Sequence, residues 1–193
     1  MMHTADLLKV FAEHRGDAIV ISGRGGRHWV DVSETPLDLP LGDPAMGGHA
    51  GFGLGLALAQ PNRRVVLFDS EGDILMSLGQ LATVAEQAPA NFYHLILDNE
   101  VYATTGGQPV PGSKVVDYAG VARSVGYPTA VNITELDDFG AKLPGLLATS
   151  GPVFVALKVF PEVENTPIGQ RVRWRKRGAD KVVQDLRGAL GAG

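Results

Sequence analysis

The chain alternates between short uninterrupted runs of apolar residues and longer segments in which apolar residues recur at helical spacing. A run without polar alternation is typical of a strand that is buried on both faces of a parallel sheet. The runs that fit this description are residues 18–21, 64–69, 92–97 and 152–159. The segments with helical spacing are residues 4–14, 46–59, 73–87, 115–125 and 134–147. This alternation predicts an α/β fold with three layers, in which a doubly wound, mostly parallel sheet carries helices on both faces.

Two of the expected helices begin at polar residues that are typical of caps. Thr4 is expected to be the N-cap of the first helix, and the segment from Thr134 to Asp137 resembles a capping box. Residues 33–45 contain three prolines and are expected to be irregular. Ligands of such sheets bind at the carboxyl ends of the strands. The residues that follow the strands are therefore the candidates for function.

Composition excludes several functional classes. The formal charge of −4 and a pI near 5.7 argue against a nucleic-acid-binding protein, whose binding surface is normally basic. The absence of cysteine excludes disulfides, thiolate metal sites and cysteine nucleophiles. The apolar runs are too short to span a membrane, and the first residues lack the pattern of a signal peptide. We therefore expect a soluble, cytoplasmic protein.

Two polar segments follow neighbouring strands of the predicted sheet. The acidic turn Asp69-Ser70-Glu71-Gly72-Asp73 comes after one strand, and Asp98-Asn99 comes after the next, 27 and 28 residues beyond Glu71. Carboxylate and amide oxygens are ligands that Mg²⁺ accepts, and a helix that begins near Gly72 would direct N–H groups at a phosphate. Together with Gly106-Gly107-Gln108, this arrangement favours a site for a metal ion and a diphosphate.

A simpler interpretation exists for each segment alone. Asp69 and Asp73 could serve simply as caps of the helix, without any role in binding. Asn99 could likewise serve simply to permit a turn. The glycine-rich turn at 22–26 could likewise be a plain turn. It does not indicate a nicotinamide site, because the sequence after this strand lacks the Gly-x-Gly-x-x-Gly pattern of a dinucleotide-binding loop.

The segment from about 18 to 160 resembles the diphosphate-binding domain of thiamine diphosphate-dependent 2-oxo acid decarboxylases. It is most similar to the small (beta) subunit of sulfopyruvate decarboxylase and to the matching part of phosphonopyruvate decarboxylase. Besides the two polar segments, the resemblance rests on Leu54–Ala59, Leu75-Met76, Leu81–Thr83, Ala88–Asn91 and Gly106–Pro109. It implies a thiamine diphosphate-binding fold, with thiamine diphosphate and Mg²⁺ as cofactors.

The resemblance also implies a set of ligands for the metal. In the family, a Gly-Asp-Gly turn and a downstream Asn-Asn pair hold the magnesium ion, and here Ser70-Glu71-Gly72 and Asp98-Asn99 stand at those places. Glu71 and Asn99 would then be side-chain ligands, and Val101 would offer its backbone oxygen. Glutamate is one methylene longer than the aspartate of the family, and Mg²⁺ is sensitive to ligand geometry. Either the loop has adjusted, with help from Asp73, or metal binding is weaker.

The family places a bulky apolar residue near Met46, within the segment from Asp43 to Gly48, where it holds the cofactor in a bent conformation. Met46 is therefore the candidate for this catalytic role, although it could be an ordinary core methionine. An extra glycine displaces His49 from the family position, so no catalytic role is assigned to His49. The residues expected to contact the cofactor are Ser22, Gly23, Met46, Gly47, Ser70, Glu71, Gly72, Asp73, Asn99, Val101 and Tyr102.

The family further implies a companion chain. The glutamate that bonds the pyrimidine N1′ comes from a separate pyrimidine-binding domain, so we expect an alpha subunit and a hetero-tetramer or a larger assembly. The expected reaction is the non-oxidative decarboxylation of a small anionic 2-oxo acid to an aldehyde. Carboligation of the acetolactate synthase type is one alternative, and a non-catalytic scaffold or regulatory role is another.

The expected domain division places the thiamine diphosphate-binding domain at 1–165 and a basic, helical extension at 166–193 that packs on the domain or on a partner. Residues 171–177 carry five positive charges. Such a run is usually solvated or contacts a partner. A sharper hypothesis is that some of these arginines recruit an anionic substrate, because the planar guanidinium group suits sulfonate or phosphonate oxygens.

Overall fold

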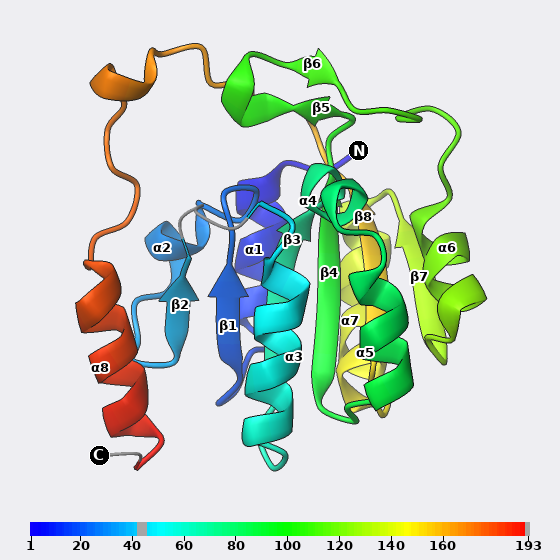
Figure 1. The fold of residues 1–193 in the computed structure, drawn as a ribbon, viewed down its shortest axis with the longest axis vertical. Coiled ribbons are helices and arrows are strands. Elements are labelled where there is room, and N and C mark those ends of the chain that lie inside the picture. The colour runs from blue at the N-terminus through cyan, green and yellow to red at the C-terminus, as the bar shows by residue number, and fades with distance from the viewer. Residues whose placement is uncertain (42–45, 192–193) are drawn as a thin grey trace.

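Six parallel strands form the central sheet of the computed structural model, which describes residues 1–41 and 46–191. The strand order is β2-β1-β3-β4-β8-β7, and every neighbouring pair is parallel (Figure 1). The strands are β1 (Ile19–Ser22), β2 (Asp38–Pro40), β3 (Val65–Ser70), β4 (Phe92–Asp98), β7 (Thr129–Ile133) and β8 (Val153–Lys158). The predicted parallel α/β sheet is confirmed, and the four apolar runs correspond to β1, β3, β4 and β8.

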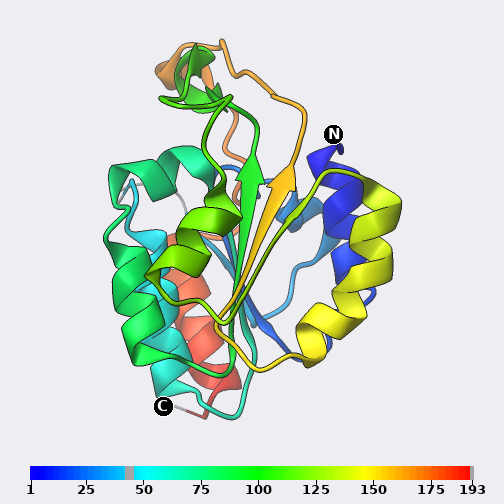
Figure 2. The same cartoon turned by 90° about the vertical axis from the view of Figure 1, so that its right-hand side faces the viewer.

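Helices cover both faces of the sheet (Figure 2). One face carries α1 (Thr4–Ala12), α2 (Trp29–Val32) and α7 (Leu136–Ala148), and the other carries α3 (His49–Ala59), α5 (Gln80–Gln87), α6 (Tyr118–Val125) and α8 (Ala179–Ala189). Each face has its own apolar core, around Phe11 and Phe68 on the first and around Phe92 and Phe154 on the second. No helix in the described ranges is long and apolar enough to cross a membrane.

The helix expected at 73–87 is two helices, and this prediction is wrong in that respect. The first is α4 (Glu71–Met76), which ends at Ser77, where ψ is 44° and the helical path is lost. The second is α5, which begins at Gln80. Leu78 is 40% exposed in the break. The break makes room for Gly47, because a Cβ atom at Gly47 would lie only 2.6 Å from Ser77 Oγ.

The two expected side-chain caps are also wrong. The N-cap of α1 is His3, without a side-chain hydrogen bond, and Thr4 is buried in the first turn. The start of this helix is instead fixed by Met2, whose backbone pairs with the end of β8 through bonds of 2.9 Å to Lys158 and Phe160. The N-cap of α7 is Glu135, and it too lacks a side-chain bond.

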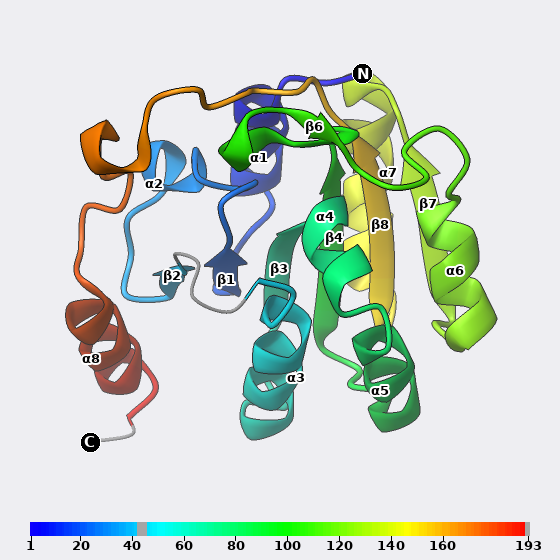
Figure 3. The ribbon, with the colours of Figure 1, turned by 45° about the horizontal axis from the view of Figure 1, so that its top comes forward.

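Several elements were not predicted. They are β2, β7, α2 and a small antiparallel hairpin made of β5 (Val101–Tyr102) and β6 (Gln108–Pro109). Figure 3 shows this hairpin over the carboxyl end of the sheet. Strand β7 lies at a sheet edge and is only partly buried, so it lacks a continuous apolar run. Strand β2 is short and begins at a charged residue, Asp38, within the segment that was expected to be irregular.

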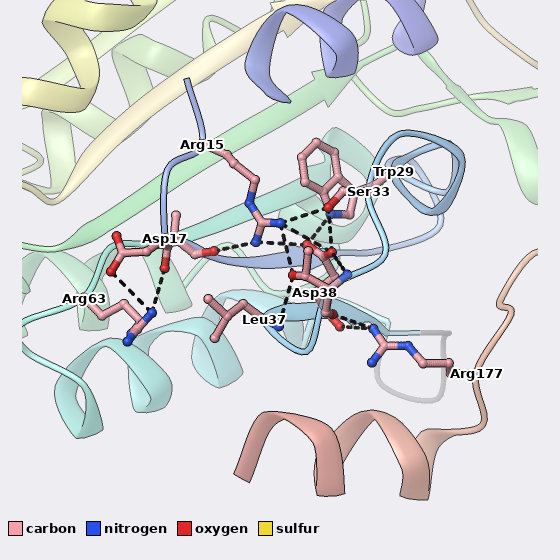
Figure 4. A network of polar contacts seen from close by, with 10 residues as sticks. Arg15, Asp17, Trp29, Ser33, Leu37, Asp38, Arg63 and Arg177 are labelled. Carbon is pink, nitrogen blue, oxygen red and sulfur yellow. Dashed lines mark hydrogen bonds and ion pairs between the residues drawn. The ribbon is translucent and has the colours of Figure 1, made fainter. Parts of the chain in front are cut away.

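A buried carboxylate explains why Asp38 can begin a strand. Its Oδ1 accepts a hydrogen bond of 2.8 Å from Trp29 Nε1, and its Oδ2 accepts bonds from Ser33 Oγ at 2.7 Å and Thr35 N at 2.6 Å. Arg15 Nη2 lies 3.1 Å from Oδ1 (Figure 4). Because every one of these donors converges on a single side chain, Asp38 joins the segment after α1, helix α2 and the edge of the sheet.

The basic run at 171–177 is partly used inside the molecule. Arg177 donates to the backbone oxygens of Thr35 and Asp38, each at 2.9 Å, and pairs with Asp185 of α8 at 2.8 Å. Lys176 donates to the backbone oxygen of Val30 at 2.6 Å. These contacts attach the C-terminal segment to the β2 edge, where Val182 and Leu186 of α8 are buried in the same core as β1 and β3.

We predict that Asp38→Ala lowers the free energy of unfolding by about 3 kcal/mol, because it leaves the Trp29 indole and the Arg15 guanidinium without their buried acceptor. Urea denaturation measures this change. Asp17→Ala is the matched control, since Asp17 forms an exposed ion pair with Arg63 at 3.3 Å and its loss should cost less than about 1 kcal/mol. Equal effects of the two substitutions would contradict the role given to Asp38.

Candidate functional site

Strands β3 and β4 bring the two predicted polar segments together. Ser70 pairs with Leu97 in the parallel register, so the residues that follow them are Glu71, the first residue of α4, and Asp98, the last residue of β4. A cavity of about 300 Å³ lies at this edge of the sheet. The expected cofactor-binding residues that line it are Met46, Ser70, Gly72, Asp73, Asn99, Val101 and Tyr102.

Four other expected residues do not line this cavity. Ser22 is fully buried in β1, and the Gly23 N–H donates to the Phe68 backbone oxygen at 3.2 Å. Gly47 and Glu71 are buried and do not contribute to the lining. The loop after β1 reaches the cavity through Arg24, Gly25 and Arg27 instead. Asp43, Pro44 and Ala45 of the segment that contains Met46 lie outside the described residues.

Ser70 caps the start of α4. Its Oγ accepts a hydrogen bond from Asp73 N at 3.2 Å and donates one to Asp73 Oδ2 at 2.8 Å. The simpler interpretation gave the capping role to Asp69 and Asp73, and this is wrong because the acceptor at the cap is the Ser70 hydroxyl. Gly72 in the first turn must remain small, since a Cβ atom there would lie 2.9 Å from the Tyr102 ring.

Glu71 is the most unusual group at this edge of the sheet. It is 1% exposed, and neither of its carboxylate oxygens has a hydrogen-bond partner. Burial, and then the charge of Asp98, raise the pKa of Glu71 to about 8. The backbone N–H groups of Asn99 and Glu100 act in the opposite direction, although neither reaches hydrogen-bond geometry. A buried carboxylate of this kind requires a proton or a cation, so its two free oxygens fit a hard divalent ion.

The loop after β4 is shaped by its polar residues. Asn99 Oδ1 accepts a hydrogen bond from Val101 N at 2.9 Å, which leaves a second lone pair on the same oxygen. Glu100 has a φ of +68°, an uncommon conformation for a residue other than glycine. Lys158, at the end of β8, lies 2.9 Å from Asp98 Oδ2 and 2.7 Å from Glu100 Oε1.

Sequence reasoning missed Lys158. Although burial opposes it, hydrogen bonds to Glu100 and Asp98 raise the pKa of Lys158. Hydrogen bonds from Lys114 and Lys158 lower the pKa of Glu100. The sequence did contain a signal for Lys158. It is the one charged residue near the end of the apolar run 152–159, and ligands of such sheets bind at that edge.

Beside the cavity, Asp69 is held between two histidines. Its Oδ1 lies 3.3 Å from His49 Nδ1, and its Oδ2 lies 3.3 Å from His94 Nε2. Burial opposes ionisation of Asp69, but the hydrogen bonds from His49 and His94 outweigh it and hold the pKa of Asp69 well below its ordinary value. His49 also lies 3.8 Å from Asp73, whose pKa is raised by burial and by the charge of Asp69. Nitrogen and oxygen atoms of His49, Asp69 and Asp73 that could bind a metal lie within 4.8 Å of one another. The contacts of His49 with the two carboxylates explain this short separation without a metal ion.

Residues 24–157 match the family described as thiamine pyrophosphate enzyme, C-terminal TPP binding domain, and the chain belongs to this family. It is 42% identical over 159 residues to phosphonopyruvate decarboxylase of Streptomyces viridochromogenes, a match that covers 81% of this chain and 39% of the relative. It is also 42% identical over 155 residues to sulfopyruvate decarboxylase subunit beta of Methanothermobacter thermautotrophicus, a match that covers 79% of each chain. These similarities confirm the resemblance inferred from the motifs.

A solved structure supports the fold. The 2-oxoglutarate:ferredoxin oxidoreductase from Magnetococcus marinus superposes with a TM-score of 0.67 at 14% identity, over 98% of this chain and 84% of the other. At this identity the likeness shows a shared fold alone. The chain therefore has the architecture of a TPP-binding domain, and it spans about two fifths of the length of the phosphonopyruvate decarboxylase that it matches.

We predict a pH dependence of stability that belongs to Glu71. Because its pKa in the folded chain is raised from 4.5 to about 8, the stability that the protonated form contributes is complete below pH 4.5 and is lost as the pH rises towards 8. In metal-free buffer with a chelator, the free energy of unfolding should therefore fall over this interval by a few kcal/mol, and at most about 5 kcal/mol. Urea denaturation at a series of pH values measures the fall.

Glu71→Gln should flatten this pH profile, because the amide does not titrate. Glu86→Gln, which changes an exposed glutamate of α5, should leave the profile as it is in the native chain. Parallel profiles for the native chain and for Glu71→Gln would contradict the burial of an unpartnered carboxylate at this position.

Proposed function

We propose that this chain is the diphosphate-binding subunit of a thiamine diphosphate-dependent decarboxylase that converts a small anionic 2-oxo acid to an aldehyde and carbon dioxide. The observation that carries the proposal is the buried, unpartnered Glu71 carboxylate next to Asn99 at the end of two paired strands. In a chain of this family, a hard cation is the natural partner of that carboxylate.

The proposed ligands follow from the site. Glu71, the second lone pair of the Asn99 amide oxygen and the backbone oxygen of Val101 would hold Mg²⁺. Ser70, Gly72 and Asp73 at the start of α4 would face the diphosphate. When bound, thiamine diphosphate supplies the nucleophilic carbon and the electron sink that decarboxylation of a 2-oxo acid requires. The protein contributes binding, orientation and the exclusion of water.

Arg24 and Arg27 support an anionic ligand in the cavity. Both line it, and Arg27 is oriented by an ion pair of 2.8 Å with Glu162 Oε2. The same carboxylate oxygen lies 2.6 Å from His28 Nε2. A guanidinium group held in this way can present its remaining N–H groups to a phosphate, sulfonate or phosphonate. We therefore propose that these arginines, rather than the internally bonded Arg171 and Arg177, bind the anionic groups.

We propose that a companion chain completes the enzyme. The sulfopyruvate decarboxylase relative is named as a subunit, and the match covers most of both chains. The companion would supply the pyrimidine-binding domain and the glutamate at N1′, within a hetero-oligomer. Met46 is 60% exposed at the cavity, which suits a side chain that meets a cofactor bound between two chains.

A non-catalytic regulatory role is the second candidate. Glu71 does not line the cavity, and its carboxylate instead lies near Asp98 and the backbone of Asn99 and Glu100. If the longer side chain cannot return to the cavity, the chain would bind metal and cofactor weakly. A Glu71→Asp variant tests this alternative directly, because a gain in affinity on shortening the side chain would favour the regulatory role.

We predict that Asn99→Ala raises the Kd for Mg²⁺ in the presence of thiamine diphosphate at least about tenfold, because one of the proposed oxygen ligands is lost. Isothermal titration calorimetry measures the change. Asn62→Ala is the control, since Asn62 is exposed in a turn at the opposite end of β3. An Asn99→Ala variant that binds Mg²⁺ as tightly as the control would contradict the proposed metal site.

Carbon dioxide release tests the reaction itself. The chain should release carbon dioxide from sulfopyruvate or phosphonopyruvate only when the companion chain, thiamine diphosphate and Mg²⁺ are all present. Tight cofactor binding without turnover of any 2-oxo acid, with the companion present, would favour the regulatory candidate.

A further inference from the structure

In the part that the structure describes, the turn that carries Met46 is held through the backbone of Gly47. Gly47 N donates to Asp73 Oδ1 at 3.0 Å, and the Gly47 backbone oxygen accepts a hydrogen bond from Gln80 Nε2 at 2.5 Å. Gly47 has a φ of +78°, a conformation that favours glycine. The described part of this turn is thus fixed by two side chains that belong to α4 and α5.

Gln80 makes a second contact with the same segment. Its Oε1 accepts a hydrogen bond of 2.6 Å from Gly51 N, in the first turn of α3. The N-cap of α3 is Gly48, which has no side chain to satisfy the free N–H groups of the helix start. The Gln80 carboxamide therefore donates to the Gly47 oxygen, before α3, and accepts from the Gly51 N–H, inside α3.

The break between α4 and α5 gives Gln80 its position. Because α4 ends at Met76 and α5 begins at Gln80, the side chain of Gln80 leaves the first turn of a new helix, opposite Gly47. Gln80 does not line the cavity, whereas Met46 and Asp73 do. Gln80 can therefore act on a ligand in the cavity only indirectly, through the segments that it bonds, and the Gly47 turn is the one that carries a cavity-lining residue, Met46.

We propose that Gln80 is a positioning residue that fixes Met46 against the ring portion of the bound cofactor. This inference rests on the proposed function, because it assumes that Met46 contacts the cofactor. The donor end of the carboxamide, which bonds Gly47, carries the positioning effect. The acceptor end, which bonds Gly51, serves the stability of α3. The two ends can be separated by a single substitution.

Gln80→Glu makes that separation. A carboxylate keeps the acceptor for Gly51 N and places a negative charge at a helix N-terminus, which favours folding. The glutamate side chain has no N–H group to donate to the Gly47 carbonyl oxygen. Its second carboxylate oxygen would lie against that carbonyl oxygen and repel it. We therefore expect a small change in Tm, because the favourable charge at the helix terminus and the unfavourable oxygen contact oppose one another, together with faster amide hydrogen exchange at Gly47 in NMR measurements. Gln87→Glu, at the exposed end of α5, is the matched control.

Two ligands then distinguish positioning from general loosening. Inorganic diphosphate with Mg²⁺ probes the diphosphate half of the site alone, and thiamine diphosphate with Mg²⁺ also probes the Met46 turn. In calorimetry, Gln80→Glu should raise the Kd for thiamine diphosphate about fivefold to tenfold, the equivalent of one lost neutral hydrogen bond. The Kd for inorganic diphosphate should change less than about twofold.

The possible outcomes separate the inference from the proposed function. Equal weakening of both ligands in Gln80→Glu, or no weakening of either, would overturn the positioning role while the function stands. A Gly47 amide that exchanges as slowly as in the native chain would overturn it as well. If the native chain binds neither ligand, with or without the companion, the proposed function fails and the inference falls with it.

Discussion

The parallel pairing of β3 with β4 is the constraint on which the site depends. It places Ser70 beside Leu97, so the chain leaves both strands at the same level and the next residues, Glu71 and Asp98, become neighbours. Two carboxylates at one buried edge raise the cost of ionising either of them. Lys158 forms an ion pair with Asp98. The Glu71 carboxylate has no such partner among the described residues.

The loops around this edge contain many glycines, and they take their shape from side chains of neighbouring elements. Asp73 bonds Gly47, and Gln80 bonds both Gly47 and Gly51. His49 packs beneath Gly23, where a Cβ atom would lie 3.1 Å from the imidazole ring. Glycine permits the close approach of these backbones, but it supplies no contact of its own. The cavity therefore keeps its form through a few polar side chains that do not themselves line it, together with Asp73, which does.

The sequence allowed the sheet and its functional edge to be predicted, because continuous apolar runs and the polar residues that follow them are local signals. Elements that depend on contacts with residues distant in the sequence were not predicted. Strand β2 exists because Arg15, Trp29 and Ser33 converge on Asp38, and no local pattern reports that convergence. The break after α4 lies against Gly47, which is distant in the sequence, and the roles of His94 and Lys158 depend on which strands are adjacent. Local patterns predicted that the two polar segments meet at one edge of the sheet, but not the contacts that hold them there.

Glu71, where the family resemblance leads to the expectation of an aspartate, sets the distribution of charge at this edge of the sheet. Its carboxylate lies near Asp98 and the backbone of the β4 loop, and neither of its oxygens accepts a hydrogen bond from the described protein groups. Asp73, two residues further along α4, lines the cavity and is already engaged by Ser70 and Gly47. A cation bound by Glu71 would compensate the negative charge of this buried carboxylate. It would do so without disturbing the contacts that hold the Met46 turn. The longer side chain is thus compatible with a metal site because Asp73 is committed to structure and Glu71 is not.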